Sequence, residues 1–167
     1  MATELHWVDG PWSGKLALAA RPRGGDWLQE EMASWQRAGV GTVLSLLTPE
    51  EEETLGLAHE ADALRAAGMA FLSLPIPDRQ VPGSETEVAA TLEKVNAKLS
   101  SGGNLVIHCR QGVGRSGLVA ACLLISRGLD SRAAVEKVGK ARGVPIPETR
   151  EQRQWIDHYA AILASPR

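Results

Sequence analysis

Cysteine is scarce in this sequence of 167 residues, which contains only Cys109 and Cys122. Two cysteines are too few for a disulfide framework, and they lack the spacing of metal ligands. We therefore expect reduced thiols, no bound metal and no cofactor. Cys122 lies in an apolar stretch, where a free cysteine usually packs as a small hydrophobic side chain rather than acting as a redox partner. Cys109 is then the candidate nucleophile.

The sequence also lacks an excess of basic residues and a long apolar segment near its start. Its formal net charge is -2, which gives no electrostatic support for binding nucleic acid. Residues 1–10 carry polar side chains and no continuous apolar run, so they resemble neither a signal peptide nor a membrane anchor. These features predict a cytoplasmic protein whose partners include neither nucleic acid nor a membrane.

No internal repeat or low-complexity linker interrupts the chain, and its length is usual for one domain, so we expect a single domain over residues 1–167. Apolar periodicity alternates between strand-like and helix-like stretches, which is typical of an α/β fold. We predict a central, mostly parallel sheet of four to five strands, flanked by helices on both faces. The expected strands are residues 15–20, 40–47, 70–74 and 104–108.

Four expected helix starts have the spacing of a capping box, namely Asp26 with Gln29, Thr48 with Glu51, Ser84 with Glu87 and Thr149 with Gln152. Apolar stripes on the first and third of these helices predict core residues, namely Leu28, Met32, Trp35, Val88, Leu92, Val95 and Leu99. The acidic run at residues 50–53 could attract a basic substrate. We interpret it instead as a first helical turn, where the helix dipole favours carboxylates.

The most informative stretch runs from Leu105 to Gly117 and reads as strand, loop and helix, with an apolar helix continuing over residues 118–126. Gly112 and Gly114 permit a tight backbone course in the loop. A loop in this setting directs successive backbone N–H groups and a helix N-terminus into one concavity, which binds a tetrahedral dianion such as phosphate. The predicted phosphate-binding loop comprises Arg110, Gln111, Gly112, Val113, Gly114 and Arg115.

Cys109 stands at the start of this loop. The positive potential that binds phosphate also favours the thiolate, which is the nucleophilic form of cysteine. Arg115, six residues later, is placed to return over the loop and hold two oxygens of the transferring phosphoryl group. With the backbone N–H groups it would do the charge neutralisation that other phosphoryl-transfer enzymes assign to Mg²⁺, so no metal is required. The alternative is a buried thiol before a helix.

The segment HCRQGVGRSG, residues 108–117, resembles the signature loop of the protein tyrosine phosphatase superfamily. Pro77-Asp78, about thirty residues upstream, resembles the mobile general-acid loop of that superfamily, and the resemblance implies that Asp78 is the acid. Segments 12–16 and 20–22 are most similar to the dual-specificity branch, near the cyclin-dependent-kinase-associated phosphatases and their bacterial relatives. The resemblance covers nearly the whole chain and implies the fold of a dual-specificity phosphatase.

The sequence departs from some members of this superfamily. Low-molecular-weight phosphatases place the loop near the N-terminus with the acid downstream, whereas this chain has the opposite order. Ile76 stands where tyrosine-specific enzymes carry tryptophan, and no tyrosine-rich loop that would set substrate depth is evident. Residues 146–152 resemble the water-positioning loop, with Glu148 where those enzymes carry glutamine. Gln152 matches by residue type, and it either positions water or completes the capping box with Thr149.

The resemblance implies a reaction in two steps. Cys109 attacks phosphorus while Asp78 protonates the leaving oxygen, and water then hydrolyses the cysteinyl phosphate with Asp78 as the base. Ser116 is expected to donate a hydrogen bond to the departing thiolate, which makes that thiolate a better leaving group. His108 is expected to face away from the phosphate, to hydrogen-bond the backbone near Cys109 and so to fix the loop.

Three functions remain open at this point. The first is a phosphatase that acts on phosphotyrosine, with or without phosphoserine and phosphothreonine, so that its partners are phosphoproteins or phosphopeptides. The second is the same chemistry on a non-protein phosphate such as a phosphoinositide or a nucleotide, for which Arg110 offers some support. The third is a phosphate-binding module without turnover, although the presence of Cys109, Asp78, Arg115 and Ser116 argues against it.

Overall fold

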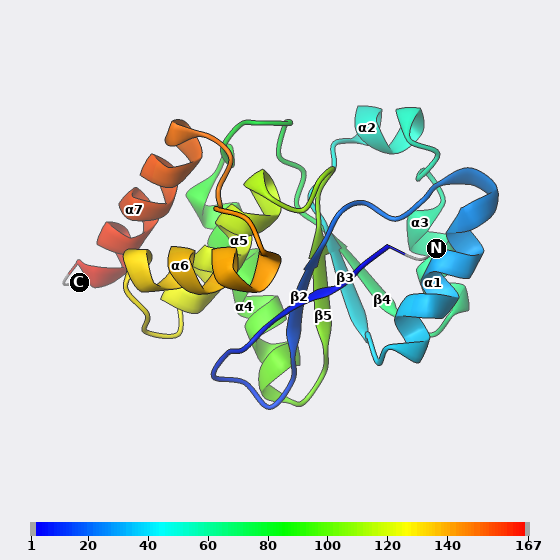
Figure 1. The fold of residues 1–167 in the computed structure, drawn as a ribbon, viewed down its shortest axis with the longest axis horizontal. Coiled ribbons are helices and arrows are strands. Elements are labelled where there is room, and N and C mark those ends of the chain that lie inside the picture. The colour runs from blue at the N-terminus through cyan, green and yellow to red at the C-terminus, as the bar shows by residue number, and fades with distance from the viewer. Residues whose placement is uncertain (1–2, 166–167) are drawn as a thin grey trace.

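The computed structural model describes residues 3–165, which form a sheet with helices on both faces (Figure 1). Five strands lie in the order β1-β2-β5-β3-β4. β1 is antiparallel to β2, and the other neighbouring pairs are parallel. This confirms the predicted central, mostly parallel sheet. The strands are β1 (His6–Val8), β2 (Leu16–Ala19), β3 (Thr42–Ser45), β4 (Ala70–Ser73) and β5 (Leu105–His108).

All four predicted strands are present, each inside its expected range. Every residue of β2, β3 and β5 is buried, as expected for central strands that helices cover on both sides. Strand β1 was not among the predicted strands. This strand has only three residues, one of which is the exposed Trp7, and such a short segment gives too few residues for a period of two to be recognised.

Helices α1 (Leu28–Arg37) and α3 (Glu60–Ala66) cover one face of the sheet, and the short 3₁₀ helix η1 (Gly25–Trp27) precedes α1. The predicted apolar stripe of α1 packs there against β2, β3 and β5. The buried Trp35 is among the largest side chains of this cluster. The cluster fixes α1 and α3 against the sheet by removing their apolar side chains from water.

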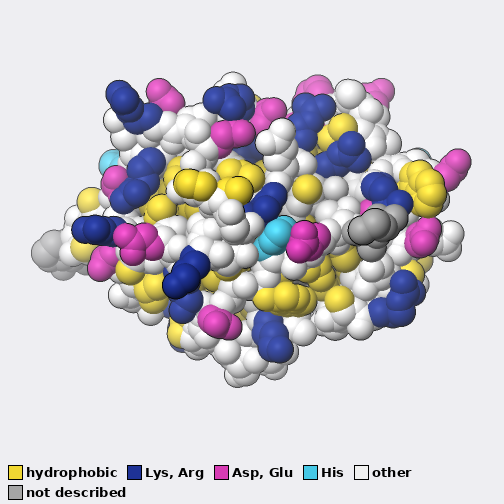
Figure 2. Space-filling model, viewed as in Figure 1, with side chains coloured by type: hydrophobic (Ala, Val, Ile, Leu, Met, Phe, Trp, Pro, Cys, Tyr) yellow, Lys and Arg dark blue, Asp and Glu magenta, His cyan; other side chains and the backbone are white. Residues whose placement is uncertain are grey.

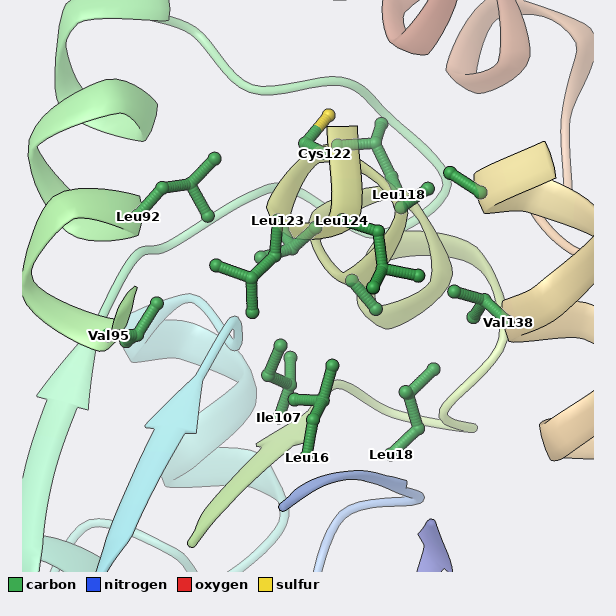
Figure 3. Close-up of a cluster of buried hydrophobic side chains, with 14 of the residues drawn as sticks. Leu16, Leu18, Leu92, Val95, Ile107, Leu118, Cys122, Leu123, Leu124 and Val138 are labelled. Atoms are coloured by element: carbon green, nitrogen blue, oxygen red, sulfur yellow. The ribbon is translucent and has the colours of Figure 1, made fainter. Parts of the chain in front are cut away.

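The opposite face carries α4 (Glu85–Ser100), α5 (Gly114–Ile125), α6 (Ser131–Arg142) and α7 (Arg150–Ala164). All residues of α5 are buried, which is the state expected for a helix that is apolar around its whole circumference. Figure 3 shows side chains of α5 between those of α4, α6, β2 and β5. Because α5 is enclosed, its first turn is held in a fixed place above the sheet.

The capping predictions hold at three of the four helix starts. Thr48 and Thr149 form complete capping boxes, while at Ser84 the side chain accepts the expected N–H bond without a return bond. The fourth prediction is wrong. Asp26 lies inside η1, and α1 begins only at Leu28 with no side-chain cap.

Several segments far apart in the sequence gather at one end of the sheet (Figure 1). They are the loops after β4 and β5, the connection from α6 to α7, and the short helix α2 (Pro49–Thr54). This is the end at which the parallel strands have their carboxyl termini. Open α/β sheets bind their ligands there, because side chains and N–H groups of several loops converge at that edge.

The surface offers no broad region of one charge on the face drawn in Figure 2, where acidic and basic side chains are interspersed. This agrees with a formal net charge of only -2. Within residues 3–165, no helix combines the length and the apolar character needed to cross a bilayer.

Candidate active site

The loop that joins β5 to α5 makes a tight turn for which glycine is required. Gly112 has a φ angle of 73°, and a Cβ atom at this position would lie 2.6 Å from the carbonyl group of Ala19. Gly114 also has little room, because a Cβ atom there would lie 3.0 Å from Oε1 of Gln152. The two glycines therefore let the loop pass close to β2 and to the start of α7.

The carbonyl groups of residues 109–113 all have donors outside this segment. Nδ1 of His108 lies 3.4 Å from the Cys109 oxygen. The Arg142 guanidinium donates to the carbonyl oxygens of Gln111 and Gly112. Backbone N–H groups complete the set: that of Arg21 donates to the Arg110 carbonyl and that of Gly117 to the Val113 carbonyl. The loop N–H groups, in contrast, have no protein acceptor among the described residues except that of Gly112, which donates to Cys109 Sγ at 3.3 Å. They are therefore available to an anion.

Arg115, in the first turn of α5, is 2% exposed. Its Nη1 donates to Glu51 Oε1 (2.6 Å) and to the carbonyl of Ile76 (2.8 Å). Its Nη2 donates to Glu51 Oε2 (2.9 Å) and to Asp78 Oδ1 (3.0 Å). Burial lowers the pKa of Arg115, but the hydrogen bond to Glu51 and the nearby acidic groups outweigh burial and raise that pKa above its ordinary value. The guanidinium therefore stays charged, and of its five N–H groups only that on Nε has no partner in these bonds.

Glu51 is the functional candidate that sequence reasoning missed. Its side chain is only 11% exposed and forms a two-pronged ion pair with Arg115. Burial raises the pKa of Glu51, but hydrogen bonds from Arg115 and Thr48 outweigh burial and hold that pKa below its ordinary value. The interpretation of residues 50–53 as a simple helix start is thus incomplete. Local sequence gave no sign of this contact because capping explains Glu51 equally well.

The segment after β4 brings Asp78 to the same place. Ile76 is fully buried, its N–H donates to the Leu46 carbonyl at 3.0 Å, and its own carbonyl accepts from Arg115. Two residues later, Asp78 has a half-exposed side chain whose Oδ1 lies 3.0 Å from Arg115 Nη2. The structure therefore places the predicted acid beside the predicted phosphate-binding arginine.

A small polar cavity opens at this point, with a volume of about 90 Å³. Charged and polar side chains dominate its walls, which suits a compact anion better than an apolar ligand. Within residues 3–165, no cluster of three or more His, Cys, Asp or Glu side chains is arranged to hold a metal ion. The lining residues are Asp78, Arg79, Cys109, Arg110, Gln111, Gly114, Arg115 and Glu148.

Gln152 is fully buried and connects the start of α7 to the loop that carries Asp78. Its Oε1 accepts from the N–H groups of Glu148 and Thr149, and its Nε2 donates to the carbonyl of Gln80. Arg79 adds a second connection through an ion pair with Glu148 at 3.3 Å. These bonds match the capping alternative for Gln152. That Gln152 or Glu148 positions water stays a prediction.

The two remaining predicted site residues are both buried. The Oγ atom of Ser116 has no hydrogen-bond partner among the described residues, and its donation to Cys109 stays a prediction. His108 approaches the Cys109 carbonyl with Nδ1, which fits the predicted backbone contact. Its Nε2 lies 2.7 Å from Glu60 Oε2, a contact that the sequence did not indicate.

Cys122 lies in α5, away from the cavity. It is fully buried among apolar side chains (Figure 3), and burial raises the pKa of its thiol far above its ordinary value. It packs as the small hydrophobic side chain that was expected.

The chain is similar to known proteins in sequence and in fold. The family model described as the DSP-PTPase phosphatase domain of Swiss Army Knife proteins matches residues 5–159. Cyclin-dependent kinase inhibitor 3 of Rattus norvegicus is 28% identical over 142 residues, which is 83% of this chain. The chain spans 66% of that relative, which is slightly less than two thirds of its length.

Two solved structures extend the comparison. Kinase associated phosphatase, with its catalytic cysteine replaced by serine, has a TM-score of 0.87 at 21% identity and covers 100% of this chain and 99% of its own. The active form of Tk-PTP has a TM-score of 0.77 at 26% identity and covers 94% of this chain and 96% of its own. The first likeness, at its low identity, shows the shared fold.

Proposed function

We propose that this chain, which belongs to the DSP-PTPase phosphatase domain family of the protein tyrosine phosphatase superfamily, hydrolyses phosphomonoesters through a cysteinyl-phosphate intermediate. One observation carries the proposal: a nucleophile, a cation and an acid from two separate segments line one small cavity. These groups are Cys109, Arg115 and Asp78. A phosphate group that enters the cavity meets free loop N–H groups and the guanidinium at the same time.

In the first step the thiolate of Cys109 attacks phosphorus. The S–P bond forms as the P–O bond to the leaving group breaks, and Asp78 transfers a proton to the leaving oxygen. In the ligand-free protein, Asp78 accepts a hydrogen bond from Nη2 of Arg115. Because the phosphate is a competing acceptor for that guanidinium, its arrival releases the Asp78 carboxylate, which takes up from solvent the proton that it passes to the leaving group. The negative charge of the transferring group is then held by Arg115 and the loop N–H groups.

In the second step a water molecule attacks the phosphocysteine. Asp78, now ionised, accepts a proton from the water while the S–P bond breaks and inorganic phosphate forms. The thiolate of Cys109 leaves with the electron pair of that bond. The unpaired hydroxyl of Ser116 supplies a hydrogen bond to the departing sulfur, which lowers the energy of the thiolate.

We further propose a phosphoprotein as the substrate, with phosphotyrosine preferred over phosphoserine. The kinase-related and phosphatase names of the relatives support a protein substrate. Phenolate is a better leaving group than an alkoxide, so an aryl ester reacts faster at equal binding. A cytoplasmic location remains a prediction.

A second candidate is a non-protein phosphate with more than one anionic group, such as a phosphoinositide or a nucleotide. Arg79 and Arg110 both line the cavity. Arg79 is paired with Glu148, whereas no ion pair forms at Arg110 among the described residues. Arg110 is therefore free to bind a second phosphate beside the one being hydrolysed.

A substrate panel tests both candidates. The purified protein is assayed for phosphate release from p-nitrophenyl phosphate, matched phosphotyrosine and phosphoserine peptides, inositol phosphates and nucleotides, each with and without EDTA. We expect the phosphotyrosine peptide to react faster than the phosphoserine peptide, and EDTA to have no effect. Much faster turnover of an inositol phosphate would favour the second candidate. Absence of turnover with every substrate would leave only a binding module.

A further inference from the structure

A buried acid and a buried imidazole lie behind the phosphate-binding loop, on the side of β5 that faces α1 and α3. Glu60 is the first residue of α3, and its side chain is 2% exposed. Its Oε2 lies 2.7 Å from Nε2 of His108, which is completely buried. Neither the reaction described above nor the capping of α3 uses Glu60. Burying a carboxylic acid costs free energy. We therefore expect its contact with His108 to have a function.

The two ring nitrogens of His108 face two different oxygen atoms. Nδ1 lies 3.4 Å from the carbonyl oxygen of Cys109, and a carbonyl oxygen only accepts hydrogen bonds. Nδ1 must therefore carry a proton for this contact to be attractive. On the other side of the ring, Oε2 of Glu60 lies 2.7 Å from Nε2. This contact fixes the orientation of the ring, so that Nδ1 stays directed at the Cys109 carbonyl.

The Cys109 carbonyl matters because of the peptide bond that follows it. In a planar trans peptide the C=O and the next N–H point in opposite directions. A donor that holds the Cys109 carbonyl on the far side of the loop therefore turns the Arg110 N–H toward the cavity side. Arg142 holds the carbonyls of Gln111 and Gly112 in a similar way, but the peptide nearest the nucleophile depends on His108.

We propose that Glu60 is a positioning residue for the phosphate-binding loop, acting through His108 to fix the first peptide of that loop. Glu60 holds the ring of His108 in place, Nδ1 of that ring holds the Cys109 carbonyl, and the Arg110 N–H is thereby presented to the bound anion. The inference rests on the proposed function, because it assigns Glu60 a part in binding the same phosphate group. Glu60 itself never touches the substrate.

Three substitutions separate this role from plain packing. Glu60→Leu removes the partner of Nε2, and Glu60→Asp is one methylene too short to keep the 2.7 Å contact. Glu60→Gln retains length, and its side-chain amide can still hydrogen-bond Nε2, so the orientation of the ring is preserved. Glu31 offers a matched control: it is also fully buried and is paired with Arg23 at 2.7 Å, but it lies on α1 and makes no contact with the loop. Glu31→Leu should lower stability alone.

The experiment measures inhibition of p-nitrophenyl phosphate hydrolysis by tungstate, with melting temperatures recorded for every variant. We expect Glu60→Leu and Glu60→Asp to weaken tungstate binding about tenfold, the size of effect that loss of one well-placed hydrogen bond produces. Glu60→Gln should stay within about twofold of the unmodified protein. Glu31→Leu should melt earlier and bind tungstate as before. In ¹⁵N-histidine spectra, His108 should carry its proton on Nδ1.

Three results would overturn the proposal. They are unchanged tungstate inhibition in the Leu and Asp variants, a Gln variant as impaired as the Leu variant, and a His108 that is protonated on Nε2 alone. Failure of the proposed function looks different, because the unmodified protein would then neither hydrolyse the ester nor bind tungstate. That result would remove the anion site and with it any positioning role for Glu60.

Discussion

The two cysteines lie in regions that burial alone does not distinguish. Cys109 is 3% exposed and Cys122 is 0% exposed, and both belong to the segment that runs from β5 through α5. At Cys122, burial within the apolar core raises the pKa of the thiol. Around Cys109, backbone N–H groups and the charged Arg115 converge on one cavity. Reactivity thus follows the polar groups around a thiol, not its exposure.

Replacement of the nucleophile Cys109 should cause the largest loss of activity, whereas replacement of Cys122 should cause none. Cys109→Ser keeps the loop N–H groups and Arg115 but supplies a hydroxyl that does not ionise at neutral pH, so turnover should fall by at least about 10⁴. Binding of inorganic phosphate should persist, as calorimetry can show. Cys122→Ser provides the control and should keep its activity. Residual turnover by Cys109→Ser close to that of the unmodified protein would exclude a phosphocysteine.

Loss of the acid should give the next largest effect. The first step needs a proton donor for the leaving oxygen, and Asn cannot supply that proton. Asp78→Asn should therefore lower kcat by about 10² to 10⁴. The loss should be smallest for an aryl phosphate whose leaving group hardly needs a proton. An unchanged rate on alkyl phosphates would mean that another residue is the acid.

A smaller effect on activity should follow when the ion pair that holds the Arg115 guanidinium is weakened. Glu51→Gln retains shape but replaces two charge-assisted hydrogen bonds to Arg115 by at most one, so kcat/KM should fall about tenfold to a hundredfold. Glu50→Gln, an exposed neighbour in α2, should have no effect. Assays of both variants with p-nitrophenyl phosphate make the comparison. Equal activities would show that the loop alone orients Arg115.

The part of the site that is continuous in sequence could be predicted, whereas the part that supports it could not. Residues 108–117 contain their own strand end, glycines and helix start, so local chemistry was enough. Asp78 was found through its resemblance to a known loop. Glu51 and Glu60 lie 64 and 48 residues from their partners. Their roles depend on how α2 and α3 meet the sheet, and no local pattern specifies that packing.

The same reasoning accounts for the successes and failures in the fold. The pattern of short apolar runs bounded by Gly, Pro or polar residues located four strands, because burial on both faces leaves such a run in β2, β3 and β5. It missed β1, whose three residues include the exposed Trp7. The capping rule failed at Asp26, where Gly25 has a φ angle of 58° and the chain forms a 3₁₀ turn first.

The smallest expected effect on activity concerns Cys122, and it returns to the comparison of the two thiols. Cys122→Ala should leave kcat/KM within about twofold and lower the free energy of unfolding by about 1–2 kcal/mol at pH 7, through loss of buried contacts. That difference should shrink at higher pH. A thiol ionises above about pH 8.5 in the unfolded chain, while burial keeps it protonated in the folded protein, so ionisation favours unfolding of the unmodified protein only. By pH 10 this amounts to about 2 kcal/mol, which urea denaturation at the two pH values can measure. A difference that stayed constant would mean that Cys122 ionises inside the folded protein, and its contrast with Cys109 would disappear.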